Sequence, residues 1–124
     1  MDDISRKFQR DLNTGLVGFV LLGVLEASND DLYGYDIAKR LQEGREGESI
    51  FKEGSLYPVL RALAAKGWLA SRIVPSYSGP PRRYYRITAA GRVVLANWRA
   101  VWSDTRDFVE RFAAQAVDSP RDAT

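Results

Sequence analysis

The stretch GSLYPVLRALAAKG (residues 54–67) has the pattern of one short helix with its own start and stop signals. Ser55 is the predicted N-cap, because its hydroxyl can accept a hydrogen bond from an early free N–H. Pro58 is then placed in the first turn, where its missing N–H costs nothing. Lys66 and Gly67 are typical of a helix C-terminus, with a cation at the negative end and a glycine for the left-handed exit.

The two faces of this predicted helix differ in chemistry. At about 100° per residue, one face is apolar and consists of Leu56, Val59, Leu60 and Leu63. The opposite face has no acid and carries Tyr57, Pro58, Arg61 and Ala65. A small, cationic ridge with hydrogen-bonding groups is suited to the major groove of DNA. An ordinary amphipathic surface helix has the same pattern, so the helix alone leaves both interpretations open.

The composition indicates one globular domain and gives no sign of an enzyme. Its 124 residues, 45% of them hydrophobic, suffice for a single core. The chain has no cysteine and no histidine, which removes disulfides, thiol and imidazole chemistry and the usual zinc or iron sites. It has no Gly-rich phosphate loop and no G-x-S-x-G motif, so nothing points to catalysis, a metal or a cofactor. No apolar run reaches the roughly 18 residues of a membrane span, and we expect a cytoplasmic protein.

Charge is unevenly distributed along the chain, although the net charge is only +2. Residues 1–53 carry eleven acids and seven bases, and residues 104–124 carry five acids and three bases. The window between them has no acid and eight bases, namely Arg61, Lys66, Arg72, Arg82, Arg83, Arg86, Arg92 and Arg99. This pattern predicts binding to a polyanion. Alternatively, acids of the first half fold back and neutralise the window, and Arg86 and Arg92 are candidates for such pairs.

Two helices are predicted before the central one. Residues 4–27 form a helix that is apolar on more than one side, so a chain this short cannot bury it alone, and we infer a partner chain. Residues 32–43 form a second amphipathic helix. Residues 44–49 are a predicted charged turn, and residues 50–51 are a short apolar anchor.

A β-hairpin and a long helix are predicted after the central helix. Residues 68–74 and 83–87 have strand composition, and the Pro-, Ser- and Gly-rich residues between them form a loop. Thr88 is the predicted N-cap of the last helix. Positions 94, 98, 101, 105, 108 and 112, which are hydrophobic except for Thr105, alternate in spacing between four and three residues. Such a seam favours helix pairing between two chains.

Three motifs in this order resemble the PadR family of transcriptional regulators. They are LYGYDIAKRL (residues 32–41), GSLYPVLRAL (residues 54–63) and GPPRRYYRIT (residues 79–88) followed by Gly91. The resemblance runs over about residues 12–112 and is closest to the smaller subfamily with a single C-terminal helix. It implies a mainly α fold with a β-hairpin wing: a winged helix-turn-helix over residues 1–87, a dimerisation helix over residues 88–118 and a tail over residues 119–124.

The resemblance also implies a homodimeric repressor that binds an inverted-repeat operator in double-stranded DNA. The third helix enters the major groove and the wing touches the flanking backbone or minor groove. The implied DNA-binding residues are Tyr33, Ser55, Tyr57, Pro58, Arg61, Lys66, Arg82 and Arg83. Arg83 stands where the family often has lysine, which favours bidentate phosphate contact. The implied dimer interface comprises Leu16, Phe19, Val20, Val94, Trp98, Val101, Trp102, Phe108 and Phe112.

Individual roles within this set have alternatives. Arg61 contacts either a base or a phosphate. Ser55 donates to a phosphate, caps its helix, or does both. Of the neighbouring tyrosines, Tyr33 is expected to face outward and Tyr35 to face the core.

The tryptophans and the overall function also leave alternatives. Trp98 and Trp102 lie one helical turn apart, where they either line a site for a planar aromatic effector or fill a solid dimer core. Trp68 is expected to plug the core beneath the wing. The competing function is a winged-helix adaptor whose basic face binds an acidic protein partner.

Overall fold

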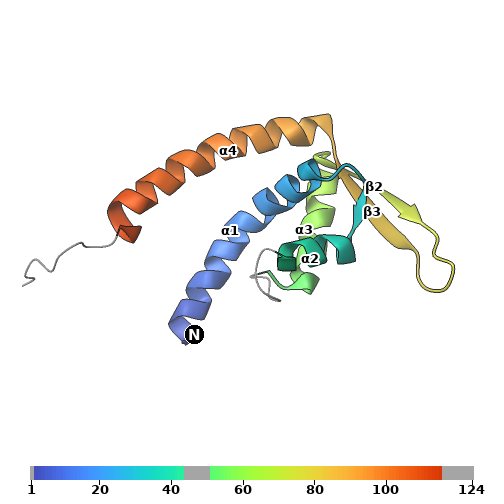
Figure 1. The fold of residues 1–124 in the computed structure, drawn as a ribbon, viewed down its shortest axis with the longest axis horizontal. Coiled ribbons are helices and arrows are strands. Elements are labelled where there is room, and N and C mark those ends of the chain that lie inside the picture. The colour runs from blue at the N-terminus through green and yellow to red at the C-terminus, as the bar shows by residue number, and fades with distance from the viewer. Residues whose placement is uncertain (1, 44–50, 116–124) are drawn as a thin grey trace, which may run out of the picture.

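The computed structural model describes residues 2–43 and 51–115. Helices pack around a small three-stranded antiparallel sheet (Figure 1). The elements in chain order are α1 (Asp3–Ala27), β1 (Leu32–Tyr33), α2 (Gly34–Glu43), α3 (Glu53–Ala65), β2 (Leu69–Val74), β3 (Arg82–Ile87), α4 (Ala89–Val109) and the π-helical turn η1 (Glu110–Ala114). The predicted fold class, a mainly α winged helix with a β-hairpin wing, is confirmed.

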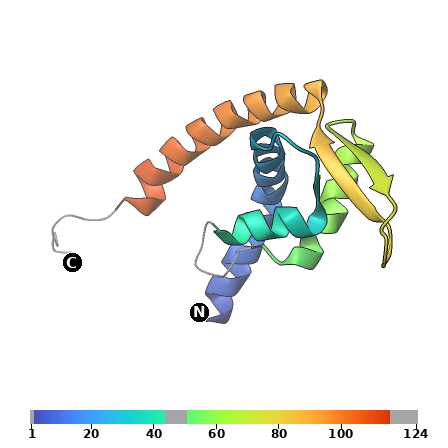
Figure 2. The same cartoon turned by 45° about the vertical axis from the view of Figure 1, so that its right-hand side comes forward.

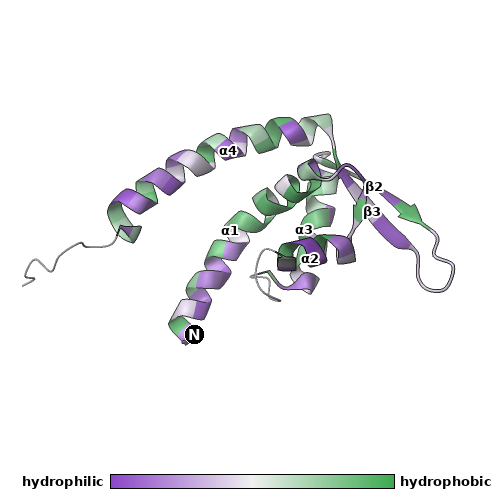
Figure 3. Cartoon of the chain, in the orientation of Figure 1, coloured by the Kyte–Doolittle hydropathy of each residue, from purple (hydrophilic) through white to green (hydrophobic). Residues whose placement is uncertain are grey.

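The core lies where α1, α2, α3 and the start of α4 meet the sheet. Each element contributes its apolar face, and the most deeply buried side chains are Leu21, Leu22, Ile37, Leu56, Leu60 and Leu95. The predicted apolar face of α3 is confirmed, with Val59 half-buried at its margin. Figure 3 shows that hydrophobic residues dominate the C-terminal half of α1, which crosses this core.

The long helix α4 leaves the winged-helix body and extends well beyond it (Figures 1 and 2). Thr88 is confirmed as its N-cap, because the Thr88 hydroxyl accepts from the backbone N–H of Gly91 at 3.0 Å. The same hydroxyl donates to the backbone oxygen of Gly67 at 2.7 Å, which fixes the start of α4 to the end of α3. Gly67 has a φ of 81°, as predicted for a left-handed helix exit.

The start of the central helix differs from the prediction. α3 begins at Glu53, and Lys52 is its N-cap without a side-chain hydrogen bond. Ser55 is therefore inside the first turn, and its hydroxyl donates backward to the backbone oxygen of Lys52 at 2.7 Å instead of capping. Pro58 consequently lies beyond the first turn. Glu53 at the first helical position interacts favourably with the helix dipole, which favours this earlier start.

The second predicted helix starts two residues late. Leu32 and Tyr33 form β1 and pair with Tyr85 and Tyr84 of β3, so α2 begins at Gly34. The first helix was placed correctly, and its N-cap is Asp2, whose carboxylate accepts from the backbone N–H of Ser5 at 2.6 Å.

The remaining boundaries are tested only in part. Three predictions fall outside the described residues: the charged turn at residues 44–49, residue 50 of the apolar anchor, and the tail at residues 119–124. The division into residues 1–87, 88–118 and 119–124 stays a prediction. Within residues 2–43 and 51–115, no helix has the length and apolar character needed to cross a membrane.

Candidate nucleic-acid interface

The outer face of α3 is available to a ligand. Pro58, Arg61, Ala62 and Ala65 are exposed there, opposite the buried leucines of the same helix. The Arg61 side chain forms no hydrogen bond or ion pair with any residue that the structure describes. Its five N–H donors are therefore unengaged within this part of the chain.

Tyr57 lies on the flank of α3 that faces α2. Its ring is half-buried against Gly34, and this burial raises the pKa of the phenol, with a smaller contribution from the Glu53 carboxylate. The hydroxyl stays protonated near neutral pH and retains its capacity to donate a hydrogen bond. Tyr57 thus combines a packing role for its ring with a polar tip beside the exposed face.

Three of the eight bases in the acid-free window are neutralised by acids from the first half of the chain. Arg72 pairs with Asp31 at 2.9 Å. Glu26 binds Arg99 at 2.7 Å and Arg92 at 3.8 Å, so the pair expected for Arg92 is confirmed.

The other five bases form no ion pair within residues 2–43 and 51–115: they are Arg61, Lys66, Arg82, Arg83 and Arg86. The pair expected for Arg86 is thus absent from the described part of the chain. Arg61 and Lys66 belong to α3 and its C-cap, and the other three belong to β3. Within the described residues, neutralisation by acids therefore accounts for only a minority of the window, and the cations on α3 and the wing stay unbalanced there.

The two predicted wing arginines lie on opposite faces of β3. Side chains alternate along a strand, so Arg83 shares a face with the buried Tyr85, and Arg82 shares the other face with Tyr84. Arg83 donates to the hydroxyl of Ser71 at 3.1 Å. Arg82 lies over the ring of Tyr33, 4.6 Å from its centroid.

The predicted orientations of Tyr33 and Tyr35 are wrong. Tyr35 is 55% exposed, whereas Tyr33 is half-buried between Tyr35, Tyr84 and Arg82. The reason is the strand at residues 32–33, which shifts the start of α2 and gives the core positions to Ile37 and Ala38. Tyr35 therefore joins the exposed candidates, and the prediction missed it because pairing with β3 is not visible in the local pattern.

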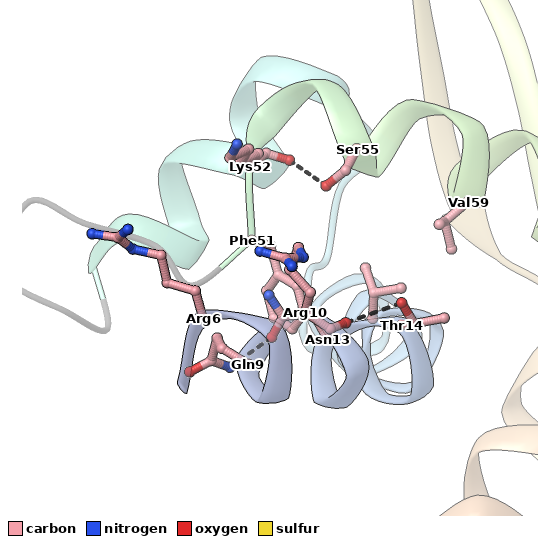
Figure 4. Close-up of a pocket in the computed structure, with 10 residues that line it drawn as sticks. Arg6, Gln9, Arg10, Asn13, Thr14, Phe51, Lys52, Ser55 and Val59 are labelled. Carbon is pink, nitrogen blue, oxygen red and sulfur yellow. Dashed lines mark hydrogen bonds between the residues drawn. The ribbon is translucent and has the colours of Figure 1, made fainter. Parts of the chain in front are cut away.

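A cavity of about 550 Å³ flanks α3 on the side of α1. Arg6 and Arg10 of α1 line it together with Lys52 and Ser55 at the start of α3, and Figure 4 shows Arg10 extending toward Phe51 while Arg6 points to the side. Arg6 pairs with Asp3 at 3.3 Å, while Arg10 and Lys52 have no ion pair with a described residue. These cations extend the basic surface along one side of α3. Sequence reasoning missed them, because they belong to the acid-rich first half.

A second, larger cavity of about 760 Å³ lies between α1 and α4. Trp98 is half-buried there, edge-on to Trp68 at 5.4 Å between ring centroids, and Trp102 is tilted against Phe19 at 6.4 Å. Trp68 packs against the core as expected but is only half-buried, with Lys66 over its ring at 5.0 Å.

The predicted interface residues divide into two groups. Within one chain, half-buried side chains are found at Leu16, Phe19, Val20, Val94 and Trp98. Exposed side chains are found at Val101, Trp102, Phe108 and Phe112. Phe108 and Phe112 are 65% and 68% exposed and contact each other at 4.9 Å between centroids. α4 thus presents an apolar surface that the single chain leaves uncovered.

Comparisons with known proteins agree with this geometry. Residues 21–97 match the model of the transcriptional regulator PadR-like family. The chain is similar to the crystal structure of a PadR family transcriptional regulator from Eggerthella lenta, with 31% identity, a TM-score of 0.76 and coverage of 93% of this chain and 96% of that one. It is also similar to a PadR-like transcription factor from Bacteroides fragilis, with 30% identity, a TM-score of 0.68 and coverage of 86% and 99%. A transcriptional regulator from Clostridium thermocellum shows 27% identity, a TM-score of 0.73 and coverage of 83% and 98%.

Proposed function

The chain belongs to the PadR-like family of transcriptional regulators, and from this premise we propose that it is a homodimeric, DNA-binding repressor of the cytoplasm. The observation that carries the proposal is the set of cations on α3 and β3 that form no ion pair with a described residue, next to an exposed α3 face whose acid, Glu53, stands at the first residue of the helix. Such a surface fits the phosphates and groove edges of a duplex.

Residue roles follow from the position of each side chain. Arg61 is central on the exposed face, so we assign it to a base edge or to a phosphate beside it. Tyr57 offers its hydroxyl from the flank, while Ser55 and Pro58 line the face near the start of α3. Lys66, Arg82 and Arg83 are assigned to phosphates, and we add the exposed Tyr35 to the candidates.

The dimer is proposed to form through α1 and α4. Val101, Phe108 and Phe112 expose apolar surface to water in one chain, which a second copy would cover. A row of exposed apolar residues at Ile4, Phe8 and Leu12 on α1 is available to the same partner. A two-fold axis through this interface requires half-sites about one or two helical turns apart.

We further propose that a planar aromatic compound relieves repression by binding between α1 and α4. The cavity there is lined by the side chains of Trp98, Trp102 and Phe19, which offer stacking surfaces. Tryptophan fluorescence against a panel of planar aromatic compounds tests this. Quenching at low concentration is expected, and no quenching across the panel would leave a solid dimer interface.

Band shifts with DNA from upstream of the protein's own gene test the main proposal. Specific binding is expected at an inverted repeat, and the affinity should fall steeply with salt because cations on the protein replace condensed counterions. Analytical ultracentrifugation of the free protein should give a dimer. A monomer, or equal affinity for all duplexes, would contradict the proposal. Capture of an acidic protein without any DNA binding would favour the adaptor.

A further inference from the structure

Aromatic rings connect the wing to the start of α2. Tyr33 lies at the centre of the cluster, with the ring of Tyr35 stacked on it at 6.1 Å and the ring of Tyr84 tilted against it at 5.3 Å between centroids. The guanidinium of Arg82 lies 4.6 Å from the Tyr33 centroid. One side chain in a two-residue strand therefore touches both the exposed start of α2 and a cation of the wing.

Strand register explains why these groups meet. Tyr33 is directly opposite Tyr84 in the antiparallel pairing of β1 with β3, so the two rings share one face of the sheet. Arg82 is two residues from Tyr84 on the same strand and projects from that face as well. Backbone pairing thus brings these three side chains onto one face of the sheet.

The two arginines that lie over tyrosine rings on this face are held in different ways. Arg72 lies over Tyr84 at 5.2 Å and also pairs with Asp31, so an acid neutralises its charge. Arg82 has the ring of Tyr33 but no acid partner among the described residues. An aromatic face orients a guanidinium while leaving its charge and its N–H donors available to an anion.

We propose that Tyr33 is a positioning residue, which holds Arg82 ready for a DNA phosphate through its ring and does not itself contact DNA through its hydroxyl. This inference rests on the proposed function and replaces the direct DNA contact predicted for Tyr33. It makes the wing and the start of α2 one unit, so that both approach the duplex together.

Substitutions at Tyr33 separate the ring from the hydroxyl. Tyr33→Phe keeps the stacking surface, and its affinity for the operator should stay within about twofold of the wild type. Tyr33→Leu removes the aromatic face and should weaken binding about 3- to 30-fold, the range that a cation–π contact supports. Equal losses in both variants would assign the role to the hydroxyl and overturn the proposal, as would unchanged binding by Tyr33→Leu.

A double-mutant cycle tests whether Tyr33 acts through Arg82. Arg82→Gln should weaken binding in the wild-type background and have little further effect in Tyr33→Leu. Arg83→Gln is the matched control on the opposite face of β3, and its effect should add to that of Tyr33→Leu. Additive effects of Arg82→Gln and Tyr33→Leu would contradict positioning.

Hydrogen exchange of the free protein gives a readout that needs no DNA. Amide exchange in β3 should be faster in Tyr33→Leu and in Arg82→Gln, and unchanged in Tyr33→Phe. Arg82→Gln alters only an exposed side chain, so it reports on the contact even where Tyr33→Leu fails to fold. Unchanged exchange in Arg82→Gln would overturn the proposal.

Failure of the wild type to bind DNA would refute the proposed function, while the exchange data would still decide whether Tyr33 holds the wing.

Discussion

Gly34 lies so close to the ring of Tyr57 that a Cβ at position 34 would overlap Cε1 of the ring. The contact joins the first residue of α2 to the flank of α3 and sets how the two helices of the helix-turn-helix approach each other. Glycine is required here because a side chain would not fit beside the Tyr57 ring. A left-handed backbone is not the reason, since Gly34 is not among the glycines with a positive φ.

Replacement of Gly34 by alanine should therefore destabilise the protein. Overpacking of this kind costs about 1–3 kcal/mol, because the Tyr57 ring must leave its position or the helices must separate. Thermal denaturation should show a lower Tm, and Tyr57→Leu in the same chain should recover part of the loss. Gly23→Ala is the matched control, since open space surrounds a Cβ there and a helical alanine is favoured over glycine. A Tm for Gly34→Ala equal to that of the control would show that the contact is not tight.

Arg61→Ala should cost about 1–3 kcal/mol of specific DNA binding. The side chain is exposed and has no partner among the described residues, so its removal should leave the fold intact. Band shifts with operator and unrelated duplexes measure the change, and circular dichroism checks the fold. Normal operator affinity in this variant would mean that another residue reads the sequence.

Arg83→Ala should lower the slope of log affinity against log salt by about one, because one phosphate contact is lost. Its side chain lies on the face of β3 that carries the buried Tyr85, and its hydrogen bond to Ser71 is exposed, so little stability should be lost. Arg99→Ala is the control, because Arg99 is paired with Glu26 and lies on α4. A slope that does not change in Arg83→Ala would remove this arginine from the DNA contacts.

Local patterns predicted most of the fold. The apolar face of α3, the Thr88 cap and the hairpin strands depend on residues close in sequence, and the structure confirms them. The strand at residues 32–33 was missed because its partner strand β3 is distant in the chain. The orientations of Tyr33 and Tyr35 were reversed for the same reason.

The candidate site was only partly predictable from charge. The acid-free window identified the cations on α3 and β3 that form no ion pair with a described residue, but the sequence could not tell which members would pair with acids elsewhere. Arg72 and Arg99 are paired through contacts between distant elements. Arg10 was overlooked because folding brings it beside α3 from a segment with a net negative charge, and Lys52, the N-cap of α3, because it belongs to that same segment.

The raised pKa of Tyr57 predicts a specific loss of stability in alkali. The phenol is more easily ionised in the unfolded chain, at about pH 10, than in the folded protein. Its contribution to stability is complete below that pH and is lost as the pH rises through the higher folded pKa. The free energy of unfolding, measured by urea denaturation across this range, should therefore fall less steeply in Tyr57→Phe than in the wild type. Parallel curves for the two proteins would show that Tyr57 has the same pKa in both states.

Phe108→Asp should dissociate the dimer and leave the winged helix folded. The side chain is 65% exposed in one chain, so an acid at this position costs little in the monomer. In the proposed interface the same carboxylate would be buried without a partner, which costs several kcal/mol, and the dimer dissociation constant should rise by more than about tenfold. Val93→Asp is the matched control, because Val93 is 62% exposed on α4 outside the predicted seam. Sedimentation at several protein concentrations measures both variants, and equal dissociation constants for the two would mean that Phe108 lies outside the dimer interface.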